Sequence, residues 1–103
     1  MPTFAWDDDN LEHLRQEHPG VLPADADSIW QLPWVQLPNV RGRAQVLFLG
    51  IDRKGRLLAL PSDPTGQHDV WRPRTAHEVT TEWQRAAYYD TVEEASETGG
   101  AHD

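Results

Sequence analysis

Cysteine is absent from this chain of 103 residues. Its absence excludes disulfide bonds, thiolate nucleophiles and zinc sites built on cysteine. No set of histidine and acidic residues has the spacing of metal ligands, and the sequence contains neither a phosphate-binding loop nor a dinucleotide fingerprint. We therefore expect a protein that works without a metal or a cofactor.

Hydrophobic runs long enough to cross a membrane are also missing. The first residues, MPTFAWDDD, lack the basic region and apolar core of a secretory signal, which predicts a cytoplasmic protein with no membrane contact. A chain of this length builds one hydrophobic core. We expect a single domain over residues 1–90, and an acidic, glycine-containing tail over residues 91–103 that is disordered.

Basic residues are scarce, with nine lysines and arginines against 17 aspartates and glutamates and a net charge of −8. Taken alone, this acidity argues against a nucleic-acid ligand, because lysine and arginine dominate phosphate binding. The charges are unevenly distributed, however. Residues 1–40 and 78–103 each carry one basic and seven acidic residues, whereas residues 41–77 carry seven basic and three acidic ones. The middle of the chain is either a basic working surface or a set of solvated charges that fall unevenly.

The densest apolar stretch, Ala44 to Pro61, predicts a central β-hairpin. Two short apolar runs flank the polar residues 52–55, and Gly55 suits the left-handed backbone of such a loop. Each run is almost continuously hydrophobic, which predicts cover on at least part of both faces. Helices must supply that cover.

Helices are predicted on either side of the hairpin. Asp7 is expected to cap a helix over residues 7–18, and residues 23–31 to form a shorter one. Thr75 and Glu78 have the spacing of a capping box, which predicts a third helix that begins at residue 75 and lays one apolar stripe on the sheet. Short strands are predicted at residues 3–6, 35–37 and 67–72.

These elements together predict an α+β fold. Its core is a small twisted antiparallel β-sheet of three to five strands, with the N-terminal helices and the C-terminal helix packed on one face. Pro38 follows the strand at residues 35–37 and confines it to an edge, because proline cannot donate to a ladder.

Several short motifs stand in an order that points to a known family. They are Phe4-Ala5-Trp6-Asp7 with Asn10, His13, His18 and Gly20-Val21, then Arg43, Gly50 and Gly55-Arg56-Leu57-Leu58, and finally Val70-Trp71-Arg72-Pro73. Over residues 3 to about 90, the chain resembles the BrnT-type toxin family. The resemblance implies a RelE-like fold, a toxin of a type II toxin–antitoxin system that acts as a ribonuclease, and a ribbon-helix-helix antitoxin as its partner.

Metal-independent RNA cleavage needs a base for the 2′-hydroxyl proton, an acid for the leaving 5′-oxygen and cationic donors to the phosphorane. His13 and His18 are the predicted proton-transfer groups, because imidazole titrates near neutral pH. Arg72 is the predicted catalytic cation, at the end of a strand where it can grip a phosphate. The predicted RNA-binding residues are Arg43, Arg56, Trp71 and Arg74.

Each of these predictions has a structural alternative. His13 and His18 are five positions apart, a rotation of roughly 140° on a helix, so they share a face poorly. Arg72 and Arg74 can pair with nearby carboxylates, and the tryptophans can simply fill a core. Two other classes of function also stay open. One is a toxin-like protein-binding module without nuclease activity, which the acidic flanks favour, and the other is an acidic mimic that occupies a basic surface of another protein.

Overall fold

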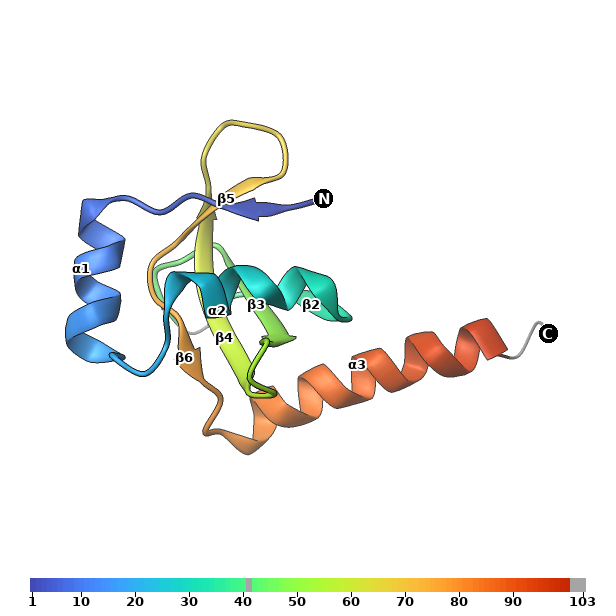
Figure 1. Cartoon of the computed structure of the whole chain (residues 1–103). Helices are drawn as coiled ribbons and strands as arrows, with labels where there is room; N and C mark the ends of the chain where they lie inside the picture. The colour runs from blue at the N-terminus through green and yellow to red at the C-terminus, as the bar shows by residue number, and fades with distance from the viewer. Residues whose placement is uncertain (41, 101–103) are drawn as a thin grey trace.

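A computed structural model describes residues 1–40 and 42–100 of the chain, with side chains through residue 95. Within these residues, one sheet has six strands: β1 (Thr3–Phe4), β2 (Trp34–Pro38), β3 (Val46–Ile51), β4 (Leu57–Pro64), β5 (Val70–Pro73) and β6 (His77–Glu78). The strand order is β1-β5-β4-β3-β2, and β6 pairs with β4 (Figure 1). The predicted α+β class is therefore confirmed, and β2 is an edge strand as Pro38 indicated.

The sheet is mixed rather than purely antiparallel. Strands β1 and β5 run parallel, with Thr3 opposite Val70 and Phe4 opposite Trp71. The other strand pairs are antiparallel. The prediction of an antiparallel sheet was wrong at this edge, because helix α1 (Asp8–Glu17) follows β1 and carries the chain away before it can turn back as a hairpin.

The hairpin of β3 and β4 is the centre of the molecule, as predicted. Gly55 in its turn has a φ of 81°, the left-handed conformation that glycine adopts without strain. Successive residues of β3 enter opposite cores: Phe48 belongs to one buried cluster, and Leu47 and Leu49 belong to the other. Continuous hydrophobicity in this hairpin thus reflects burial on both faces.

Helices lie on both faces of the sheet, so the prediction that they share one face was wrong. Helix α1, helix α2 (Pro23–Asp27) and the 3-10 helix η1 (Ser28–Gln31) cover one face, where Leu14 and Ile29 pack with Phe48. Helix α3 (Glu82–Gly100) covers the other face, where Tyr88 packs with Leu47 (Figure 1). A sheet with two apolar faces needs both covers.

The predicted capping box at Thr75 and Glu78 does not form. Glu78 lies in β6, where it pairs with Leu58 of β4, and Val79 donates its backbone N–H to the Leu57 carbonyl over 2.8 Å. The long strand β4 has backbone N–H and C=O groups free at this edge, and the segment pairs with them as a strand. Helix α3 therefore begins only at Glu82. The helix then continues through Gly100, past the predicted domain end at residue 90, and residues 101–103 of the predicted tail lie outside the described residues.

Asn10 fastens α1 to the sheet. Its side chain accepts from the Asp7 N–H over 2.7 Å, while Asp7 accepts from the Asn10 N–H over 2.9 Å, so Asp7 is the helix N-cap as predicted. The Asn10 amide also donates to the carbonyls of Ala5 and Pro73 over 3.1 and 3.0 Å. One buried amide therefore fixes the start of α1 against the end of β5.

Among residues 1–40 and 42–100, no helix combines the length and the apolar character needed to span a membrane.

Candidate functional site

Three of the seven predicted site residues meet in one hollow between α1 and β5. This α1–β5 hollow has a volume of about 300 Å³ and opens widely to solvent. It is lined by Asp9, Asn10, His13, Arg72, Arg74 and Thr75. The Asn10 hydrogen bond to the Pro73 carbonyl brings the two walls together, so the fold itself creates the juxtaposition of His13 with Arg72 and Arg74.

A cluster of three histidines lies beside the hollow. The ring centroids of His13 and His18 are 6.3 Å apart, and those of His18 and His77 are 5.5 Å apart. His18 is the C-cap of α1, with φ −139° and ψ 62°, so the rotation expected for two helical residues does not separate the rings. In the part of the chain that the structure describes, no group of three or more histidine and acidic side chains is arranged to hold a metal ion.

The environment of His18 keeps its imidazole neutral. Partial burial lowers the pKa of His18 below its ordinary value of 6.5, and the neighbouring His77 and His13 lower it further. At neutral pH this ring is therefore an acceptor of protons, which is the property a general base needs. His13 is more exposed and lies at the hollow itself.

Sequence reasoning missed His77 and Thr75. Both were assigned to a helix by the false capping box, which hid the fact that β6 carries His77 toward the end of α1. The Thr75 hydroxyl is buried without a hydrogen-bond partner among the described residues and lies in the wall of the hollow. Because this oxygen has almost no accessible surface, a ligand in the hollow does not reach it unless the wall shifts.

Arg72 is held by Asp7 in a two-point ion pair. The Arg72 Nε lies 2.6 Å from Asp7 Oδ2, and its Nη2 donates to Oδ1 over 3.0 Å. The hydrogen bond from Arg72, together with the Asn10 N–H, lowers the pKa of the Asp7 carboxyl to about 2. The pair is formed on an exposed surface, with 37% of the Arg72 side chain accessible, so it positions the guanidinium without shutting it away from a ligand.

Arg74 is paired in a similar way. Its Nε lies 2.6 Å from Asp63 Oδ2, and the other oxygen of Asp63 accepts from the Gln45 N–H over 2.9 Å. Arg74 thus joins the end of β5 to β4 and to the loop that precedes β3. Carboxylates offset both arginines of the hollow, and Asp9 adds another negative charge to its wall.

Arg56 belongs to a separate ion-pair cluster. This turn cluster consists of Asp25, Asp52, Arg53, Lys54 and Arg56. The Arg56 guanidinium is 2.9 Å from Asp25 and 2.8 Å from Asp52, and it also donates to the Gly20 carbonyl over 2.8 Å. All three of its nitrogens are engaged, so its visible task is to hold the hairpin turn against α2.

Asp25 is the buried centre of the turn cluster, with no exposed surface. Burial alone raises the pKa of this carboxyl, but the Leu22 N–H and the cations Arg53 and Lys54 outweigh burial and leave the pKa well below its ordinary value. Asp25 is therefore ionised at neutral pH. Nothing in the sequence pointed to this pairing, because α2 and the turn are far apart along the chain.

Trp71 and Arg43 complete the predicted set. Trp71 is half-buried and packs edge to face on Phe48, with ring centroids 5.3 Å apart, so most of its surface serves the core. Arg43 is exposed in the loop before β3 and makes no ion pair within the described residues. Neither residue lines the α1–β5 hollow.

The wall of the hollow carries His13, Arg72 and Arg74, and the neutral imidazole of His18 lies beside it. That set can move protons and orient a phosphate, although each arginine already has a carboxylate partner.

Comparison of the chain with models of known protein families, with curated proteins and with solved structures found no match in any of the three.

Proposed function

We propose that this protein is a BrnT-like toxin of a type II toxin–antitoxin system, a metal-independent ribonuclease that inhibits translation. The observation that supports this proposal best is the grouping of His13, His18 and Arg72 at the α1–β5 hollow. The proposal includes a RelE-like fold, a ribbon-helix-helix antitoxin as partner and a cytoplasmic site of action, and these parts rest on the resemblance of residues 3 to 90 alone.

The roles follow from the lowered pKa of His18 and from the positions of His13 and Arg72 at the hollow. His18, with its lowered pKa, takes the proton of the 2′-hydroxyl, whose oxygen then attacks the phosphorus. His13 gives a proton to the departing 5′-oxygen, and a 2′,3′-cyclic phosphate remains. Arg72 stabilises the charge that develops on the phosphorane oxygens, and Arg74 supports the RNA backbone beside it.

Cleavage of RNA by the purified protein in the presence of EDTA tests the proposal. We expect the parent protein to cut, and His13→Ala, His18→Ala and Arg72→Ala to lose activity by about a hundredfold or more. His68→Ala is the matched control, because this histidine is 97% exposed and lies outside the hollow. Undiminished cleavage by the His18 and Arg72 variants would refute the assigned site.

The second candidate is a toxin-like protein-binding module without nuclease activity. One observation favours it: Arg72 and Arg74 are both ion-paired, and only Arg43 and Arg85 among the described cations have no acidic partner. RNA would have to compete with these carboxylates for the arginines. A parent protein that neither cuts RNA nor arrests growth on expression supports this candidate over the nuclease.

Asp7→Asn separates the two candidates further. Asparagine is as good an N-cap as aspartate, so α1 keeps its start while Arg72 loses its charged partner. If the hollow binds RNA, the variant should bind RNA more tightly than the parent, with a steeper dependence on salt. If the protein is only a protein-binding module, RNA binding stays absent in both forms.

A further inference from the structure

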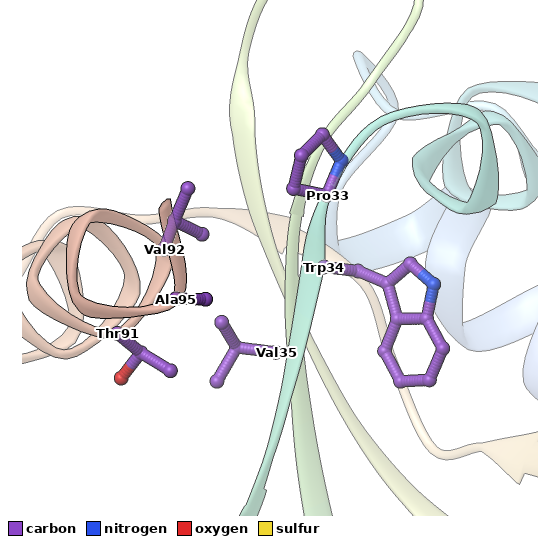
Figure 2. A pocket seen from close by; sticks show the side chains of 6 residues that line it. All are labelled: Pro33, Trp34, Val35, Thr91, Val92 and Ala95. Atoms are coloured by element: carbon purple, nitrogen blue, oxygen red, sulfur yellow. The ribbon is translucent and has the colours of Figure 1, made fainter. Parts of the chain in front are cut away.

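A second concave surface lies on the opposite side of the sheet, between β2 and α3. This β2–α3 groove has a volume of about 270 Å³ and is lined by Pro33, Trp34, Val35, Thr91, Val92 and Ala95. Figure 2 shows the side chains of Val92 and Ala95 facing Val35 across the groove, while the Trp34 indole points to the other side of the strand. Among the side chains that the structure describes, which end at residue 95, no charged one lines the groove.

The groove arises because α3 overhangs the edge of the sheet. The Tyr88 hydroxyl donates to the Pro33 carbonyl over 2.7 Å and fixes the helix at the start of β2. Figure 1 shows the helix continuing past β2, where the sheet ends. Val92, which packs half-buried against the core cluster of Val35, and Ala95 border the groove.

Strand β2 offers an open hydrogen-bonding edge beside the groove. It pairs with β3 on one side, and no strand of residues 1–40 and 42–100 pairs with its other side. The unpaired N–H and C=O groups of an edge strand are a template for one more strand. A strand added there would lie over the overhanging part of α3 and cover its apolar stripe.

The flank of the groove is acidic. On a helix with 3.6 residues per turn, Glu94 lies roughly 60° from Thr91 and so flanks the lining of the groove, whereas Asp90 lies roughly 140° from Ala95 and belongs, like Glu93, to the outward side. The side chains of Asp90 and Glu94 are exposed, and neither forms an ion pair among the described residues. Glu93, also exposed, lies on the outward face of the helix.

We propose that the β2–α3 groove binds an extended basic segment of a partner protein, which adds a strand to β2. Alternate side chains of the segment are apolar and fill the space between Val35 and Ala95, while an arginine or lysine of the segment pairs with Glu94. A second copy of this chain fits the groove poorly, because it would bring two acidic helices together. The groove shares no residue with the α1–β5 hollow, so this proposal stands or falls apart from the proposed function.

Selection from a random dodecapeptide display library against the whole protein tests the proposal. We expect the enriched peptides to alternate apolar and basic residues, and to shift the backbone NMR signals of residues 34–37 and 88–95. Enrichment of acidic or uncharged peptides, no enrichment at all, or signals that shift elsewhere would overturn it.

Two variants with the same change in charge sharpen the test. Glu94→Lys reverses a charge beside the groove and should weaken binding of the enriched peptides about fivefold or more. Glu93→Lys makes the same reversal on the outward face and should have a smaller effect. Equal losses in both variants would mean that only net charge is recognised and would overturn the groove as the site.

Ala95→Lys fills the groove itself at an exposed helical position, where it leaves folding intact. It should abolish peptide binding without changing the circular dichroism spectrum. Analytical ultracentrifugation of the parent protein alone then measures its oligomeric state. A concentration-dependent dimer that Ala95→Lys disrupts would assign the groove to a second copy of the chain and overturn the proposed partner.

Discussion

Replacing the buried Asp25 should weaken the attachment of the hairpin turn to α2 and lower the free energy of unfolding. The Asp25 carboxylate lies 2.7 Å from Arg53 Nε, 3.2 Å from Lys54 Nζ and 2.9 Å from Arg56 Nη2. It also accepts from the Leu22 N–H over 3.0 Å at the start of α2. Asp25→Asn removes the charge while keeping the shape and an oxygen for the Leu22 N–H, so it isolates the ion pairs.

The size of the effect follows from the exposure of each cation. The side chains of Arg53 and Lys54 are 50% and 48% exposed, so losing either pair costs less than about 1 kcal/mol. Arg56 is only 22% exposed, and its charged hydrogen bond is worth about 1.5–3 kcal/mol. Because Asp52 still holds Arg56, we expect Asp25→Asn to lower the free energy of unfolding by about 2–3 kcal/mol. Asp25→Ala should cost about 1 kcal/mol more, since it also removes the acceptor for the Leu22 N–H.

Urea unfolding followed by tryptophan fluorescence measures this loss, with Asp90→Asn on the exposed surface of α3 as the control. The Leu22 N–H and the cations together hold the pKa of Asp25 below its unfolded value of 3.8. Its contribution to stability is therefore complete above about pH 4 and is lost as the pH falls toward the folded-state pKa. The difference between parent and Asp25→Asn should shrink on acidification. A difference under about 0.5 kcal/mol at pH 7 would refute the reasoning.

Three further predictions concern packing, anchoring and titration. Gly50→Ala should lower the free energy of unfolding by about 1–3 kcal/mol in a urea titration, because the new Cβ would lie 2.8 Å from the Ile29 Cβ; an unchanged midpoint would contradict this close approach. Asn10→Ala should loosen α1 from β5 and speed amide hydrogen exchange in residues 8–17, since it removes a cap, a buried hydrogen bond to Pro73 and a part-buried one to Ala5; unchanged exchange would contradict the anchoring role. Because the folded-state pKa of His18 lies below 6.5, the parent protein should lose stability as the pH falls below neutrality, and His18→Gln should flatten that dependence in thermal melts between pH 5 and 8. An equally steep pH dependence in both proteins would contradict the lowered pKa.

Local signals predicted the parts of the fold that depend on neighbouring residues. The Asp7 cap, the hairpin turn at Gly55 and the edge position forced by Pro38 all have their cause within a few residues of sequence. The segment from Thr75 to Glu78 shows the limit of such signals. Its spacing matches a helix cap, but the free edge of β4 offers backbone partners from far along the chain, and pairing with them outweighs local preference. The helix layers on both faces of the sheet could also have been predicted from the hairpin. Its strands are apolar on both sides, and each apolar side needs a layer of helix to cover it.

The candidate site could be predicted only in part for the same reason. Histidine and arginine types drew attention to His13, His18 and Arg72, and two of these line one hollow with the third beside it. His77 reaches the cluster through a strand that no local pattern indicates. The partners of the arginines were equally hidden: Arg72 pairs with Asp7 across most of the chain length, where spacing carries no information.

The uneven charge along the sequence has a structural explanation that changes its functional meaning. Acidic residues of the N-terminal flank neutralise the basic middle of the chain: Asp7 pairs with Arg72, and Asp25 pairs with the cations of the hairpin turn. Segments of opposite charge are thus brought together by folding, and the basic surface expected from the sequence largely disappears. The acidic residues of α3 have no such partners among the described residues. Within the described part of the chain, unpaired negative charge therefore remains on α3, and also on α1 at Asp8, Asp9 and Glu17, and its field extends about a Debye length of 8 Å into solvent at physiological salt. A cationic partner is attracted to both acidic helices, whereas a polyanion such as RNA must displace carboxylates to reach the arginines of the hollow.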